Sequence, residues 1–260
     1  MKRSPIWSWV WFIIGLFYFF IPLVSTLEFS LRMIKGKYTL EAYRAAFEDP
    51  QFYTSFGYSL LWAVLTIIIS LLLVVPTAYW VQLKLPKLRP YVEFVTLMPF
   101  VVPAVVLTFG LIRLYSGAPF HLNSTPATLI IGYTVLSLPY MYRSVDSGLR
   151  AVDIRTLTEA AQSLGASWGT ILKDVIFPNL RVAILSGVFL TFAIVMGEFT
   201  FASLLAKPAF GPYIELLGSQ KAYTPQAVSV MSFAITWGSI MLIQWIGRGA
   251  RGQVQLGGAR

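Results

Sequence analysis

The sequence has no cysteine, a single histidine and few charged residues, and each of these shortages excludes a class of protein. Without cysteine there is no disulfide framework, zinc–cysteine site, thiol nucleophile or iron–sulfur cluster. The one histidine, His121, argues against histidine-based metal sites and a Ser-His-Asp triad, and we expect it to be a solvated loop residue. Neither G-x-x-x-x-G-K-[ST] nor G-x-G-x-x-G occurs, so the common phosphate-binding loops are missing too. These shortages argue against a soluble enzyme.

Apolar residues are the abundant class. They make up 57% of the 260 residues, and only 12% are charged, against about a quarter in soluble domains. A helix needs about 20 apolar residues to cross the bilayer core, and the sequence predicts an all-α membrane protein with six such helices. The predicted spans are Ile6–Leu27, Tyr58–Leu83, Phe94–Leu114, Ala127–Tyr142, Val182–Leu205 and Ala227–Ile246. We expect the first to stay uncleaved, because it is too long for a signal peptide and no small-x-small site follows it.

The distribution of Lys and Arg predicts that both termini lie in the cytoplasm. With that orientation 13 of the 20 basic residues fall on the inner side, as the positive-inside rule requires. The loop from Lys84 to Arg89 is the clearest signal, because it carries three cations and no acid. The basic tail, residues 247–260, is interpreted as an anchor to anionic lipid heads. The net charge of +9 therefore needs no nucleic-acid partner.

One long polar segment, residues 142–181, lies on the predicted inner side and is patterned as two short helices. Thr156 and Glu159 have the spacing of a capping box at the start of the first helix. Gly165 is placed to end that helix in a left-handed turn, and Ser167 to cap the second. Pro178 ends the second helix or begins the next one.

The same segment carries a motif with fixed spacing. Glu159-Ala160-Ala161, three residues, Gly165, nine residues and then Val175-Ile176-Phe177-Pro178 resemble the EAA loop, E-A-A-x3-G-x9-I-x-L-P, of bacterial ABC importer permeases. Val175 and Phe177 are conservative departures from that pattern. The chain therefore resembles the binding-protein-dependent transport system inner-membrane component (MetI-like) family. The stretch Gly197-Glu198-Phe199 and the length are similar to the branch that carries spermidine and putrescine, iron and 2-aminoethylphosphonate.

This resemblance implies a non-catalytic permease subunit of a type I importer in the bacterial inner membrane, with a transport core at 58–246 behind a first helix and outer loop at 1–57. In relatives the EAA loop is the coupling helix that docks on a cytoplasmic ATPase dimer, which alone binds ATP and Mg. The resemblance implies this coupling role for Glu159, Ala160, Ala161, Leu164, Gly165 and Pro178. Glu159 has two open roles, capping its own helix or pairing with a cation on the ATPase.

The resemblance implies two further partners, a second permease subunit and an extracytoplasmic substrate-binding protein. The second permease is either a copy of this chain or a paralogue. The outer loop 28–56 and residues 207–225 either face the binding protein or form a plain hydrated cap.

Glu198 is the one clearly intramembrane acid, and acids in spans are costly and usually functional. It lies either on the translocation path or at a subunit interface, or it is a buried hydrogen-bonded strut. Thr96 and Thr108 are further path candidates, although such hydroxyls often bond to their own helix. The spans also contain Pro76, Pro99, Pro103 and Pro139, which act either as hinges or as static kinks.

Two other functions fit the composition less well. A secondary transporter or channel driven by an ion gradient predicts more intramembrane charge and internal repeats. A membrane-embedded enzyme, such as a lipid-modifying transferase, needs a cluster of His, Asp or Glu at a membrane edge, and the sequence offers none. Neither the solute nor the identity of the second permease follows from the sequence.

Overall fold

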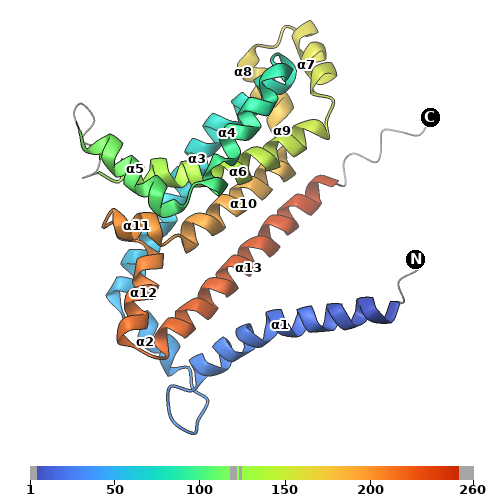
Figure 1. The fold of residues 1–260 in the computed structure, drawn as a ribbon. Helices are drawn as coiled ribbons and strands as arrows, with labels where there is room; N and C mark the ends of the chain where they lie inside the picture. Colours follow the sequence, from blue (N-terminus) through green and yellow to red (C-terminus); the bar gives the residue numbers. More distant parts are fainter. Residues whose placement is uncertain (1–4, 118–121, 123–124, 252–260) are drawn as a thin grey trace. The chain divides into compact units, whose positions relative to one another are not determined.

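The computed structural model describes residues 5–117, 122 and 125–251, and the regular elements of this part of the chain are all helices (Figure 1). His121 and the last nine residues of the basic tail lie outside the described residues. The helices that concern the fold and the site are α1 (Pro5–Leu31), α2 (Glu41–Phe47), α3 (Pro50–Leu83), η1 (Pro86–Leu88), α4 (Arg89–Val101), α5 (Ala104–Ser116), α6 (Ala127–Arg150), α7 (Ile154–Ser163), α8 (Trp168–Thr170), η3 (Ile171–Ile176), α9 (Phe177–Asn179), α10 (Arg181–Gly197), α11 (Thr200–Leu204), α12 (Phe210–Gln220) and α13 (Thr224–Arg251).

The chain divides into two units. The first comprises Met1–Thr54 and Tyr213–Thr236. In it Asp49 accepts a 2.9 Å hydrogen bond from the Gln51 backbone amide at the start of α3, and a 3.2 Å bond from the hydroxyl of Tyr213 on α12. Phe29, near the end of α1, stacks on Tyr223 with ring centroids 4.7 Å apart. These contacts join α1, α3 and α12 to the connecting segments within the first unit.

The second unit, Ser55–Pro212 and Trp237–Arg260, contains the helices that frame the candidate site. Its core at the hairpin end is formed by apolar residues of α3, α6, α7, η3 and α10. Close packing of α6 on α10 depends on small residues. A Cβ at Gly148 would lie 2.4 Å from the Cβ of Ala183, and one at Gly187 would lie 2.7 Å from the sulfur of Met141. The absence of side chains at both glycines lets the two helices approach each other closely.

Helix lengths agree with the predicted spans in part. Trp7–Leu31 and Pro50–Leu83 are long and apolar enough to cross a membrane, and they contain nearly all of the first two predicted spans. The fourth and sixth predictions correspond to α6 and α13, and α6 continues for eight residues beyond the predicted end at Tyr142. The total of six crossings stays a prediction.

The third predicted span is not one straight helix. The segment divides into α4 and α5, and the helices Pro86–Val101 and Ala104–Ser116 meet at an angle of 105°. The break lies at Val102, which has an extended backbone (φ −88°, ψ 118°) and precedes Pro103. Proline disfavours the helical conformation of the residue before it and lacks an amide hydrogen, so the helix ends there.

The fifth predicted span, Val182–Leu205, is also interrupted. Its helix, α10, begins at Arg181 and ends at Gly197. Glu198 then has an extended backbone (φ −77°, ψ 128°), and a separate short helix, α11, follows. The prediction of one continuous helix was wrong because Glu198 ends α10 and, as shown below, caps α11.

Candidate functional site

The segment that carries the sequence motif folds as a helical hairpin, residues 154–180, named the hairpin below. Its first helix, α7, begins at Ile154, and Asp153 is its N-cap. The Asp153 carboxylate accepts a 3.2 Å bond from the Thr156 amide and a 2.7 Å bond from the Thr156 hydroxyl. These two hydrogen bonds stabilise the charged form and lower the pKa of Asp153 below its ordinary value.

The predicted capping box at Thr156 and Glu159 is therefore wrong. Thr156 lies inside the first turn of α7, and the N-cap lies three residues earlier than predicted, at Asp153. Glu159 does not reach back to cap the helix; its Oε1 accepts a 2.9 Å bond from Nε of Arg155. Because both side chains of this ion pair are more than half exposed, the pair contributes little to stability, and Glu159 remains on an accessible surface.

The glycine turn forms as predicted. Gly165 has φ +77°, and the amides of Gly165 and Ala166 donate to the carbonyls of Gln162 (2.9 Å) and Ala161 (3.0 Å). This pair of bonds is a Schellman motif, which satisfies carbonyls that the end of a helix leaves free. The second part begins with Ser167, whose hydroxyl accepts a 3.3 Å bond from the Thr170 amide, also as predicted.

The second half of the hairpin is less regular than predicted. After the single turn α8, residues Ile171–Ile176 form a π-helix, and Pro178 lies in the short α9 that follows. Leu180 then interrupts the helix, and the axes of Trp168–Asn179 and Arg181–Gly197 meet at 80°. Figure 1 shows α7 and α8 near the same end of α6 and α10.

The hairpin has an inner and an outer face, and the motif residues divide between them. Ile154, Ala161, Ile171 and Ile176 are buried on the inner face. Glu159 and Ala160 are exposed on the other side of α7, and the Leu164 side chain at the turn is 88% exposed. A leucine with that exposure buries almost none of its apolar area within this chain, so the outer face is the surface available to a partner.

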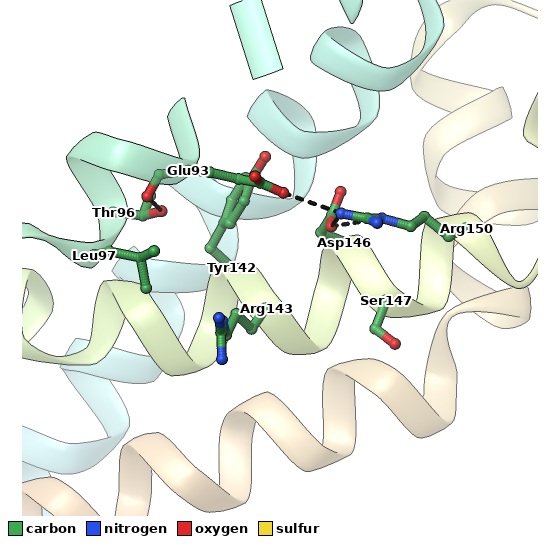
Figure 2. Close-up of a pocket in the computed structure, with 8 residues that line it drawn as sticks. All are labelled: Glu93, Thr96, Leu97, Tyr142, Arg143, Asp146, Ser147 and Arg150. Atoms are coloured by element: carbon green, nitrogen blue, oxygen red, sulfur yellow. Dashed lines mark hydrogen bonds and ion pairs between the residues drawn. The ribbon is translucent and has the colours of Figure 1, made fainter. Parts of the chain in front are cut away.

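A ring of ion pairs lies at the base of the hairpin, where α6 approaches its end, and Figure 2 shows three of its four members, Glu93, Asp146 and Arg150. Arg89 at the start of α4 contacts Glu93 (3.3 Å) and Asp146 (3.1 Å), and Arg150 of α6 contacts the same two carboxylates at 3.0 and 2.6 Å. Burial raises the pKa of Asp146 above its ordinary value, although Arg89 acts in the opposite direction. Three of these residues, Glu93, Asp146 and Arg150, line a pocket of about 450 Å³, and Thr96 lines it too.

Sequence reasoning did not find this ring, because its members are 57 residues apart and no local pattern links them. The signal available was the i, i+4 spacing of Arg89 with Glu93 and of Asp146 with Arg150, each of which predicts only a pair within one helix.

Each of the three path candidates bonds to backbone atoms close to it in the chain. The Glu198 carboxylate accepts backbone bonds from Phe201 (3.0 Å) and Ala202 (3.4 Å), which cap α11. The Thr96 hydroxyl donates to the Val92 carbonyl of its own helix (2.9 Å). The buried Thr108 hydroxyl does the same to Ala104 (2.7 Å). Glu198 therefore has a structural role in its own chain. The hydroxyls of Thr96 and Thr108 have already donated their hydrogens, so each can only accept a hydrogen bond from a solute or another residue.

Backbone packing fixes the turn around Glu198. A Cβ at Gly211 would lie 2.4 Å from the Glu198 carbonyl oxygen, and one at Gly132 would lie 2.3 Å from the ring of Phe201. Phe201 is completely buried. Gly211 lets the start of α12 pack directly against the turn, and Gly132 lets α11 pack against α6, so the position of Glu198 is set by its neighbours.

The first unit has a pocket of its own, of about 630 Å³, between the end of α1 and the following loop. Three cations line it together with aromatic residues: Arg32, Lys35, Lys37, Phe29, Tyr38 and Tyr223. Arg32 is paired with Glu28 and also bonds to the Tyr38 hydroxyl at 3.1 Å. The pocket therefore has an excess of positive charge.

Comparison with known proteins identifies the family. The model of the "Binding-protein-dependent transport system inner membrane component" family matches residues 75–249, more than half of the chain. The spermidine/putrescine transport system permease protein PotB of Salmonella typhimurium is 28% identical over 236 residues, covering 82% of this chain and 80% of that protein. A putative ferric transport system permease protein, FbpB 1 of Haemophilus influenzae, is 34% identical over 116 residues, covering 44% of this chain and 18% of that one.

A solved structure shares the fold. It is a bacterial ABC transporter involved in the import of the acidic polysaccharide alginate, and its matching chain has a TM-score of 0.66, 13% identity and 96% coverage of both chains. Because the family model matches from the last third of α3 to near the end of α13, this chain belongs to the binding-protein-dependent transport system inner membrane component family.

Proposed function

We propose that this subunit forms the translocation path of an ATP-driven importer for a small polar solute of the polyamine class. The chain is an ABC importer permease of the type I fold. The solute class is supported by the similarity to PotB over four-fifths of both chains. A solute delivered by an extracytoplasmic binding protein passes between this chain and a second permease, and ATP is bound and hydrolysed with Mg by separate cytoplasmic ATPases.

The single observation that carries the coupling part of the proposal is the outer face of the hairpin. Leu164 is a large apolar residue held outward by a rigid glycine turn, with Ala160 and Glu159 exposed beside it. Small and apolar residues flanked by a charge are suited to a helix docking in a groove of another protein. Ala161 contributes differently, because it packs inward and supports the turn from within.

Crosslinking tests this docking. The chain has no native cysteine, so Leu164→Cys gives a unique attachment point for a photoreactive probe in membranes that contain the whole transporter. We expect the probe to join this chain to the ATPase. A matched control is Leu72→Cys, a leucine of α3 that is 70% exposed and should reach lipid or a permease. If the probe at position 164 crosslinks only to lipid, the hairpin does not dock on the ATPase and the coupling proposal is rejected.

Transport tests the energy source and the solute. The purified complex, with its binding protein, is reconstituted in vesicles and given labelled spermidine. We expect uptake to require ATP and to be insensitive to ionophores that collapse ion gradients. Uptake that follows an imposed gradient without ATP would instead support a secondary transporter. If the complex hydrolyses ATP but does not take up spermidine, the chain would still be an importer permease, and polyamines would be excluded as its solute class.

The path itself is proposed to include Glu198, with Thr96 and Thr108 as acceptors for the ammonium groups of the solute. Glu198→Gln retains an oxygen that accepts from the α11 amides but removes the charge, whereas Glu198→Ala removes both. If the charge contacts the solute, the Gln variant should lose uptake while the complex still assembles. Normal uptake by the Gln variant, with loss of assembly in the Ala variant, would leave Glu198 with its capping role alone.

On the proposed orientation, both termini and the hairpin are cytoplasmic in a bacterial inner membrane. The pocket between α1 and the following loop then faces outward. Its excess positive charge, from Lys35, Lys37 and Arg32, supports contact with acidic side chains of the binding protein, because complementary charge favours encounter.

A further inference from the structure

The last turns of α3 contact both halves of the hairpin, although no residue there belongs to the sequence motif. The Tyr79 hydroxyl lies 2.8 Å from the Thr158 hydroxyl of α7, and both side chains are almost completely buried. Thr158 also bonds to the carbonyl of Ile154 in its own helix. Since a hydroxyl has one hydrogen and Thr158 donates it to Ile154, Tyr79 is the donor to Thr158.

The next residue along α3 holds the other half. The rings of Trp80 and Trp168 have centroids 4.8 Å apart, and Nζ of Lys84 lies 5.6 Å from the centroid of Trp168. Trp168 is the first residue of α8, directly after the glycine turn and its cap. The three residues Tyr79, Trp80 and Lys84, named the α3 clamp, therefore contact the hairpin on both sides of Gly165.

The covalent connections of the hairpin are less direct than this lateral contact. Residues 151–153 form a turn between α6 and α7, and an 80° bend at Leu180 separates α9 from α10. In contrast, α3 is one unbroken helix of 34 residues, about 50 Å long at 1.5 Å per residue. A displacement of the hairpin can be absorbed by rotation at the two bends, but the clamp passes it directly to this one long helix.

We propose that Tyr79, Trp80 and Lys84 are positioning residues that fasten the hairpin to α3, so that α3 is the helix that first receives the motion imposed on the hairpin. The inference rests on the proposed function, because it requires an ATPase to move the hairpin. We do not propose that the clamp residues bind the ATPase themselves. Tyr79 and Trp80 lie on the side of the hairpin opposite the outer-face residues Ala160 and Leu164.

The first test measures solute transported per ATP hydrolysed by the reconstituted complex. Tyr79→Phe removes one hydroxyl and retains the ring, and Trp80→Ala removes the stacked partner of Trp168. Loss of one buried hydrogen bond corresponds to about a 2- to 10-fold change in an equilibrium. We expect each variant to lower the transport-to-hydrolysis ratio by about that factor while hydrolysis continues. Trp80→Phe should recover part of the ratio, because it restores an aromatic contact.

Tyr91→Phe is the matched control. Tyr91 is 69% exposed on α4. Loss of an exposed hydroxyl breaks no buried hydrogen bond, so the transport-to-hydrolysis ratio should equal that of the unmodified chain. A purely structural role for the clamp would lower the amount of folded complex and reduce transport and hydrolysis together, with their ratio unchanged.

The second test follows the motion directly with two spin labels, at Leu72→Cys on α3 and Leu164→Cys at the hairpin turn. Both side chains are exposed, and no native cysteine competes for label. In the otherwise unmodified complex the distance between labels should keep one narrow distribution with and without ATP. In Tyr79→Phe and Trp80→Ala the distribution should broaden or shift when ATP is added.

The outcomes separate the inference from the proposed function. If the Leu164 crosslink to the ATPase fails, the proposed function fails and the clamp has no motion to transmit. The other outcome is that the crosslink forms while the clamp variants retain both the transport-to-hydrolysis ratio and the narrow distance distribution. In that case the proposed function is supported and the proposed role of the α3 clamp is rejected.

Discussion

Asp153 and Thr156 show how a single cap decides the start of the hairpin. Both residue types are favourable N-caps, and they lie three positions apart, but the sequence analysis predicted only the later register, with Thr156 as the cap. The structure takes the earlier one, because Asp153 can accept from both the amide and the hydroxyl of Thr156. The later register would use Thr156 as the acceptor and leave the carboxylate without these two donors.

The lowered pKa of Asp153 makes this cap dependent on pH. Because the folded value lies below the ordinary value of about 3.9, the cap stabilises α7 at pH above that value and is lost as the pH falls through the lowered pKa. Hydrogen exchange of the α7 amides, corrected for intrinsic rates, should therefore accelerate only in acid. Asp153→Asn should retain protection without the acid step, and Asp153→Ala should lose protection throughout. An acid step that persists in the Asn variant would contradict this assignment.

Gly165 gives a second prediction at the scale of one residue. No atom lies within 4 Å of a Cβ built at this position, so a substitution is opposed only by the left-handed backbone, at about 1–2 kcal/mol for an ordinary residue. Gly165→Val should destabilise the turn by that amount or more and lower transport per ATP. Gly165→Asn, which tolerates this conformation, should be close to the unmodified chain. Equal behaviour of Val and Asn would show that backbone strain is not the cause.

At the scale of elements, the ring of ion pairs joins α4 to α6 beside the turn that leads into α7. Asp146 is the buried member, with a side chain only 10% exposed, and it is shared by Arg89 and Arg150. Each arginine can therefore replace part of the other's contribution. The ring should behave as one unit, and its members should not contribute additively.

Thermal unfolding in detergent can measure this non-additivity. Arg89→Met or Arg150→Met alone should cost no more than about 1 kcal/mol, because the remaining arginine still pairs with Asp146. The double variant should cost about 3 kcal/mol or more, because it leaves a buried carboxylate without a cation. Arg44→Met, which removes an exposed pair with Glu48, serves as the control and should change little. Strictly additive effects would argue that the ring is a set of separate surface pairs.

Much of the helical content followed from the sequence, and the breaks did not. Hydropathy and caps located the hairpin, its Gly165 turn and its Ser167 cap, because these depend on neighbouring residues. The bend at Val102 had a local signal in Pro103, but proline is also found in unbroken helices, as Pro76 in α3 and Pro139 in α6 show. The cap of α11 by Glu198 and the ring around Asp146 depend on which backbone or side chain arrives from elsewhere, and that information is absent from a local pattern.

At the scale of the whole molecule, the fold and the charge distribution bear on different questions. The family match and the shared fold establish an importer permease, but neither fixes which side of the membrane the hairpin faces. That direction rests on the bias of Lys and Arg, of which the loop at Lys84–Arg89 is the clearest part. The same loop ends α3 beside the α3 clamp, so the positive-inside rule and the coupling proposal require the same orientation.

Labelling with a membrane-impermeant maleimide decides that orientation. Leu164→Cys lies at the hairpin turn and Tyr38→Cys in the loop after α1, and both original side chains are well exposed, at 88% and 66%. In right-side-out vesicles only the residue 38 variant should be labelled, and in inverted vesicles only the residue 164 variant. The unmodified chain, which has no cysteine, supplies the blank. Labelling of position 164 from outside the cell would place the hairpin where no ATP-consuming partner can reach it, and the coupling mechanism would fail regardless of the family.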